Sequence, residues 1–76
     1  MNKNRRKEIE DVKDQIEEIK SSIESIRDEE QDCYEILPEG IQDGERGEAM
    51  LNAVDNLEAA IDNLDDAINN LTEAQN

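Results

Sequence analysis

The feature that most constrains this chain is the spacing of the apolar residues in its C-terminal half. They recur at alternating steps of three and four residues: Val54, Leu57, Ile61, Leu64, Ile68 and Leu71. This alternation is the a/d spacing of a coiled-coil helix. Beside it, alanine occupies every g position: Ala53, Ala60, Ala67 and Ala74. The stretch therefore predicts a helix with a wide apolar face and a flank of small residues.

The N-terminal half carries the same pattern. Its apolar residues also alternate by three and four: Ile9, Val12, Ile16, Ile19, Ile23 and Ile26. No glycine or proline interrupts residues 4–36, so we expect one long helix over that range. The basic segment 1–7 is expected to be a solvated start to this helix.

The connection between the two patterns contains all three glycines and the only proline of the chain. Pro38 lacks an amide donor and disfavours helical geometry at the residue before it. The sequence therefore predicts a loop over 37–45 and a second helix over 46–74. Pro38 is also suited to opening one short helical turn, and Asp43 or Gly44 is the expected N-cap of the second helix.

Two helices of equal length with a short connection pack antiparallel. If paired residue numbers sum to 80, the predicted core layers are Ile26–Val54, Ile23–Leu57, Ile19–Ile61, Ile16–Leu64, Val12–Ile68 and Ile9–Leu71. The same alignment places Cys33 opposite Gly47, and it predicts the flanking ion pairs Lys20–Glu58 and Lys13–Asp65. The predicted fold class is all-α: residues 1–76 form a single antiparallel two-helix coiled-coil hairpin.

The other flank of the hairpin carries little charge. A lone hairpin of this size buries little apolar surface, and the second helix has an apolar face wider than one partner covers. We therefore expect a homodimer that forms a four-helix bundle. The expected interface residues are Ala53, Ala60, Ala67, Ala74, Ser22 and Gln15.

The charge of the chain is strongly acidic. There are 22 acidic and 8 basic residues, for a net charge of −14. Residues 27–76 hold fifteen of the acidic residues and two of the basic ones. This sign argues against direct binding to nucleic acid or to an anionic membrane surface.

Carboxylates recur at helical spacing on the outer face of the second helix: Asp55, Glu58, Asp62, Asp65 and Asp66. One interpretation is a solvated face that keeps a helical protein soluble. The other is a mimic of nucleic-acid phosphates, because carboxylates one turn apart are separated by a distance comparable to that between successive phosphates. The second interpretation implies a basic, nucleic-acid-binding protein as the partner.

No residue pattern indicates an enzyme. The chain has no histidine and one cysteine, so it has no nucleophile–base pair, and no cofactor or metal is expected. Cys33 is expected at a core position as a small apolar side chain, and a lone cysteine fits a reducing compartment. No apolar run is long enough for a signal peptide or a transmembrane helix.

Apolar residues also gather around the predicted loop: Tyr34, Ile36, Leu37, Ile41, Met50 and Leu51. They are suited either to a plug that closes the end of the hairpin or to a docking site for a partner. On the second interpretation, the candidate contact residues are Tyr34, Leu37 and Ile41.

The stretch from Tyr34 to Met50, with a Leu-Pro-Glu-Gly turn at 37–40 and a Glu-Arg-Gly-Glu helix start at 45–48, resembles small acidic helical-hairpin proteins of phages and prophages in Gram-positive bacteria. The run at 28–31 and the segment Asn56–Asp62 fit the same resemblance. It implies a phage origin and the host cytoplasm, but no particular activity and no site residues.

Two functions remain open. The first is a non-enzymatic protein-binding module, acting as an acidic nucleic-acid-mimicking inhibitor of a host or defence protein of the CRISPR type. The second is a structural coiled-coil oligomerisation or scaffold protein.

Overall fold

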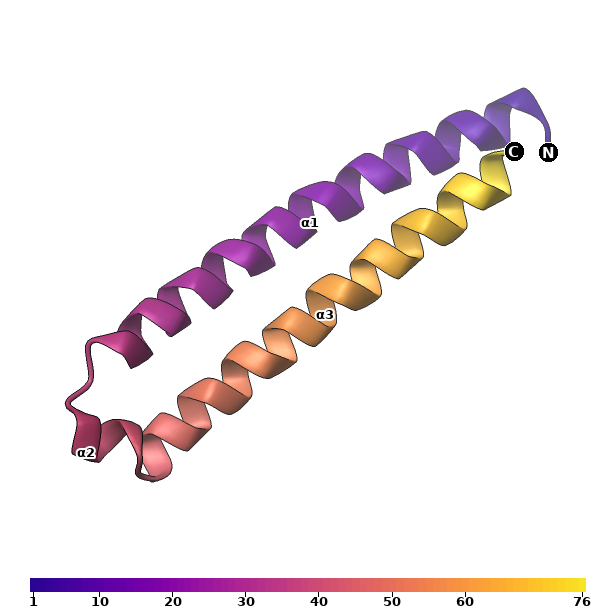
Figure 1. Ribbon diagram of the computed structural model, residues 1–76. Helices are drawn as coiled ribbons and strands as arrows, with labels where there is room; N and C mark the ends of the chain where they lie inside the picture. The colour runs from indigo at the N-terminus through magenta and orange to yellow at the C-terminus, as the bar shows by residue number, and fades with distance from the viewer.

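The computed structural model describes residues 1–76 as an elongated helical hairpin. Two long helices, α1 (Lys3–Glu35) and α3 (Glu45–Gln75), are joined through one short helix, α2 (Glu39–Gln42). The long helices lie side by side and antiparallel, with both termini at one end and α2 at the other (Figure 1). The principal extents are 58 × 15 × 11 Å. The predicted all-α hairpin is confirmed. No helix combines the length and apolarity needed to cross a bilayer.

The helix ends follow from local chemistry. Asn2 caps α1, because its side-chain oxygen accepts a hydrogen bond of 2.8 Å from the backbone amide of Arg5. Pro38 precedes α2 and supplies the fixed φ of a helix start. Gly44 is the N-cap of α3. The two long helices thus begin and end within one residue of the predicted positions.

The closed end of the hairpin depends on a close approach between α2 and the first turn of α3. Gly47 is buried there, and a Cβ atom at this position would lie 1.9 Å from the carbonyl oxygen of Gln42. Only glycine permits that approach. The Gln42 side chain in turn donates a hydrogen bond of 3.0 Å to the carbonyl oxygen of Tyr34, which ties α2 to the end of α1. The predicted placement of Cys33 opposite Gly47 is wrong, because Cys33 is exposed and Gln42 fills that position.

The core is narrow and lies mostly on α3. Val54 and Ile61 are the only buried apolar side chains. On α1 the a-position isoleucines are half-buried, but Val12, Ile19 and Ile26 are 43%, 53% and 53% exposed. The predicted core layers that contain these three residues are therefore wrong.

The reason for the difference is a rotation of α1 that turns its basic residues toward α3. The side chains of Lys13, Lys20 and Arg27 are only 17%, 22% and 27% exposed. Their aliphatic stems cover apolar surface while the charged heads reach solvent and carboxylates. α3 has no base after its first turn to repel this column of cations, so Lys20 pairs with Asp65 and Lys13 donates a hydrogen bond to Gln75. The adjacent aliphatic column of α1 is turned outward as a result.

The polar partners of two α1 lysines also differ from the expectation. Lys20 pairs with Asp65 rather than with Glu58, and Lys13 reaches Gln75 rather than Asp65. The carboxylate that Lys20 meets lies seven residues further along α3, a displacement of about 10 Å along the helix. The two backbones nevertheless stay within about one turn of the predicted alignment. The Gln75 side chain reaches the carbonyl oxygen of Arg6, and the predicted pair Ile9 and Leu71 line the same hollow. The long side chains of Lys13 and Lys20 therefore reach partners that the apolar pattern does not predict.

Candidate protein-interaction surfaces

One side of the hairpin is an apolar face. Val12, Ile19 and Ile26 are seven residues apart, so they form one column along α1. At the open end, Val12 and Leu71 line the same hollow of about 290 Å³, which shows that this column and the leucine column of α3 border the same side. We define the apolar face by these residues: Val12, Ile19, Ile26, Leu57, Leu64, Leu71, Ala53, Ala60 and Ala67.

The predicted interface residues border or belong to this face. Ala53, Ala60 and Ala67 are half-buried, whereas Ala74 is exposed. Gln15 and Ser22 are exposed on α1, and the Ser22 hydroxyl donates a hydrogen bond of 3.2 Å to the carbonyl oxygen of Glu18. Sequence reasoning missed the three exposed aliphatic residues of α1, which it assigned to the core. The signal that identifies them is the neighbouring column of cations, which faces the acidic α3.

The second candidate surface is acidic and follows α3. Asp55, Glu58, Asp62 and Asp66 are exposed and form no ion pair, while Asp65 is paired with Lys20 across 2.5 Å. Asp55, Asp62 and Asp66 occupy b and f positions, on the side of the helix opposite the d leucines and g alanines. The acidic surface therefore lies on the back of α3, away from the apolar face.

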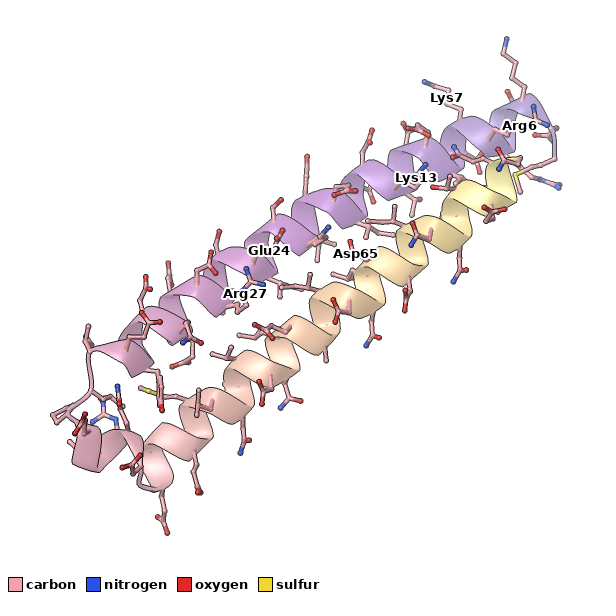
Figure 2. All side chains as sticks on the ribbon, in the orientation of Figure 1. Arg6, Lys7, Lys13, Glu24, Arg27 and Asp65 are labelled. Carbon is pink, nitrogen blue, oxygen red and sulfur yellow. The ribbon has the colours of Figure 1, made fainter.

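The basic residues leave this acidic surface uncovered. Lys13, Arg27 and the carboxylate of Asp65 lie between the long helices, whereas Lys7 extends away from α3 (Figure 2). The pKa of Lys20 is raised, first because its ammonium group donates a hydrogen bond to Asp65. The cations of the middle of α1 are thus directed into the seam between the helices. No cation projects over the exposed carboxylates on the back of α3, since α3 has no base after its first turn.

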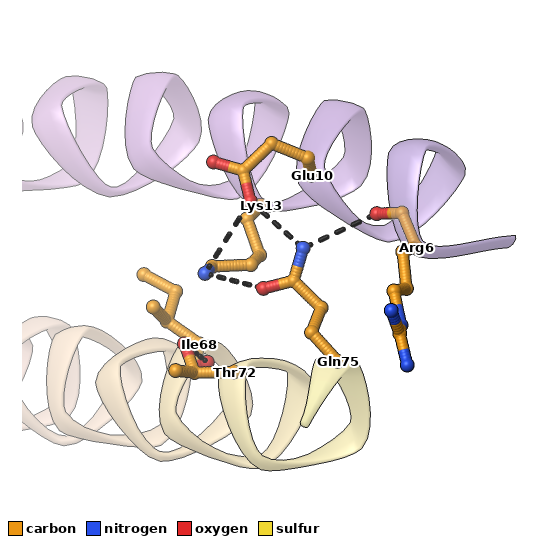
Figure 3. A network of polar contacts seen from close by, with 6 residues as sticks. All are labelled: Arg6, Glu10, Lys13, Ile68, Thr72 and Gln75. Atoms are coloured by element: carbon orange, nitrogen blue, oxygen red, sulfur yellow. Dashed lines mark hydrogen bonds and ion pairs between the residues drawn. The ribbon is translucent and has the colours of Figure 1, made fainter. Parts of the chain in front are cut away.

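A polar latch closes the open end, and sequence reasoning missed it (Figure 3). The Gln75 amide nitrogen donates hydrogen bonds to the carbonyl oxygen of Arg6 at 3.2 Å and to the Glu10 carboxylate at 2.8 Å. The Gln75 side-chain oxygen accepts one of 2.9 Å from Lys13. The pKa of Glu10 is lowered, first by the hydrogen bond from Gln75 and then by the charge of Lys13. A single amide near the C-terminus carries no pattern that would single it out in the sequence.

The apolar residues of the closed end are only partly covered. Tyr34 and Leu37 are half-buried, as a plug requires. Ile36 and Ile41 are 82% and 41% exposed, so they leave apolar surface at the tip. The cluster therefore has covered residues, as a plug would have, and exposed residues such as Ile41, as a docking site would have.

The structure offers no further candidate for chemistry. Cys33 is a free, exposed thiol, so its expected core position is wrong. No group of three or more His, Cys, Asp or Glu side chains is placed to hold a metal ion. Comparison with protein-family models, curated proteins and solved structures gives no match for this chain. The apolar face and the acidic surface are therefore the features of the molecule that bear on its function.

Proposed function

We propose that the hairpin is a non-enzymatic protein-binding module that associates with other helices through its apolar face. The observation that carries the proposal is the exposed column of Val12, Ile19 and Ile26. Single exposed aliphatic residues are common, but a contiguous apolar surface bordered by polar residues marks an interaction site. Helices that pack into the groove between two other helices use anchors at this heptad spacing.

The surface area supports the same proposal. The hairpin exposes 5542 Å², whereas a compact protein of 8.7 kDa exposes about 4,700 Å². The excess of about 800 Å² is close to what one partner contributes to a stable protein–protein interface. Only two apolar side chains are buried in the isolated hairpin, so a partner that covers this face would add substantially to the buried apolar surface.

The test compares two double variants. Replacing Ile19 and Ile26 with Gln removes the apolar column, while replacing Ser21 and Ser25 with Gln alters exposed positions outside it. Fluorescently labelled proteins are sedimented in buffer and in bacterial lysate. We expect the wild type and the serine variant to sediment faster than an 8.7 kDa monomer in at least one medium, and the isoleucine variant to remain monomeric in both. A monomeric wild type in both media would overturn the proposal.

A second function is favoured by the acidic surface on the back of α3. We propose it as a decoy for a basic, nucleic-acid-binding protein, which would be a host or defence protein of the CRISPR type in the host cytoplasm if the chain is phage-encoded. The supporting observation is that the nearby cations point into the seam between the helices, so Asp55, Asp62 and Asp66 are uncompensated. Such binding weakens steeply with salt and competes with DNA.

A separate variant tests the decoy function. Changing Asp55, Asp62 and Asp66 together to Asn removes three exposed charges outside the core. Circular dichroism should remain helical, while binding to a basic nuclease should fall to that of an uncharged control protein. Binding retained by the triple variant would assign the interaction to another surface, with the tip residues Tyr34, Leu37 and Ile41 as the next candidates.

A further inference from the structure

Building on the proposed protein-binding function, we infer that the apolar face is covered by a second copy of this chain, docked head to tail. In this arrangement α1 stacks antiparallel on the partner's α1, and α3 on the partner's α3. The basic open end of each hairpin then lies over the acidic closed end of the other. The result is a four-helix bundle with twofold symmetry.

The apolar face is self-complementary about one level of the hairpin. The α1 column is centred on Ile19, with Val12 and Ile26 seven residues to either side. The α3 leucine column is centred in the same way on Leu64. The Lys20–Asp65 ion pair, adjacent to both centres, places them at the same height. A twofold axis at this height therefore brings Val12 onto the partner's Ile26, and it pairs the two α3 leucine columns in the same operation.

Small side chains allow this approach. Ala60 and Ala67 lie beside Leu64 on the half-buried flank of α3. They leave room for the partner's leucines without a charged side chain in the way. The nearest polar groups on α1 are Gln15 and Ser22, and the hydroxyl of Ser22 is already hydrogen-bonded within its own helix. Docking therefore buries no charged group along the middle of the face.

Charge selects head-to-tail over head-to-head docking. Four of the first seven residues are basic, whereas residues 27–48 carry nine acidic and two basic side chains. Head-to-head docking would bring the two acidic ends together. Head-to-tail docking places Arg5, which lines the hollow of the apolar face, beside the partner's Cys33 and its exposed neighbours, the partner's Glu29 and the partner's Asp32. With a Debye length of about 8 Å, charges at such close range are only partly screened.

The native Cys33 serves as the probe, because it is the only cysteine and is exposed. A spin label on it reports the distance between the two copies by pulsed electron paramagnetic resonance. Each Cys33 lies fourteen residues from Ile19, so head-to-tail docking separates the labels by about 42 Å along the bundle. Head-to-head docking places them within about 20 Å, two interhelix spacings. A label at Ser21→Cys in a Cys33→Ser background lies near the axis in both cases and reports dimer formation itself.

Charge reversal gives a second readout. Arg5→Glu should raise the dissociation constant of the dimer on the order of tenfold, because symmetry removes two contacts at once. Adding Asp32→Arg to the same chain should restore it, since each new pair forms twice across the axis. Rescue is not expected in head-to-head docking, where these residues lie at opposite ends of the assembly.

The outcomes separate this inference from the proposed function. A label distance near 42 Å with charge rescue supports head-to-tail docking, and a distance below 20 Å overturns it. A wild type that is monomeric in buffer but bound in lysate overturns the second copy as partner and leaves the protein-binding function standing. A wild type that is monomeric in both media overturns both.

Discussion

Lys20 of α1 and Asp65 of α3 form an ion pair with 2.5 Å between the ammonium nitrogen and a carboxylate oxygen. It is the only ion pair that joins the two long helices. Together with the contacts of Gln75 it ties α1 to α3 across the seam between the two helices. The pair is partly exposed, so its effect is greater on alignment than on total stability.

Reversal of this pair tests which carboxylate Lys20 contacts. Lys20→Glu should lower the melting temperature by a few degrees, because it faces Asp65 with a like charge. Adding Asp65→Lys should restore the melting temperature, whereas Lys7→Glu, outside the seam, should change it little. Restoration by Glu58→Lys in place of Asp65→Lys would show that Lys20 faces Glu58, the partner predicted from the heptad spacing.

The core and the apolar face should respond differently to the same substitution. Ile61 is 7% exposed, so Ile61→Asp buries an unpaired charge and should abolish most helical signal in circular dichroism at 25 °C. Ile19 is 53% exposed, and Ile19→Asp should leave the hairpin helical. Its melting temperature should no longer depend on protein concentration. Equal loss of helix in both variants would place Ile19 in the core of the hairpin.

The two glycines at the closed end provide a matched pair. Gly47→Ala places a Cβ against the Gln42 backbone, so α2 must move, and unfolding should become easier by about 1–3 kcal/mol. Gly40→Ala meets nothing within 4 Å and should stabilise the hairpin by up to about 1 kcal/mol, because alanine is the better helix former. Urea unfolding measures both. Equal effects of the two variants would contradict the close approach at Gly47.

The latch at the open end should depend on pH. The pKa of Glu10 is lowered in the folded chain by Gln75 and Lys13, so its contribution to stability is present above the ordinary pKa of 4.5. That contribution is lost as the pH falls through the lowered value. Glu10→Gln should therefore lower the melting temperature at pH 7 and match the wild type at pH 2. The control Glu8→Gln alters an exposed carboxylate outside the latch. A deficit of Glu10→Gln that persists at pH 2 would argue against an ionic origin.

The hairpin itself follows from the sequence, because heptad spacing and Pro38 each have a single structural consequence. The rotation of α1 does not, since it results from competition between two neighbouring columns, one aliphatic and one basic. Which of the two columns of α1 faces α3 depends on the side chains that α3 presents to it. The base-free stretch of α3 after Arg46 decides in favour of Lys20 and its column. The sequence also does not predict the close approach of Gly47 to Gln42, because this contact arises from the folded tip rather than from any repeat.

The candidate surfaces were predictable to different degrees. Asp55, Asp62 and Asp66 are exposed because b and f positions point away from the seam in any register. Asp65 lies at the edge of the seam, so its environment depends on the register, and its predicted partner was wrong. The exposed Ile19 could be found only once the orientation of α1 was known.

The apolar and acidic surfaces lie on opposite sides of α3. Any partner that covers the apolar face therefore leaves the carboxylates Asp55, Asp62 and Asp66 open to solvent. In a twofold assembly of this chain the acidic surface would be displayed twice, pointing in opposite directions. A ligand with one basic groove would bind such an assembly at either of two equivalent sites. A flexible ligand with two grooves, long enough to reach around the bundle, would gain from avidity, since the first contact raises the effective concentration for the second.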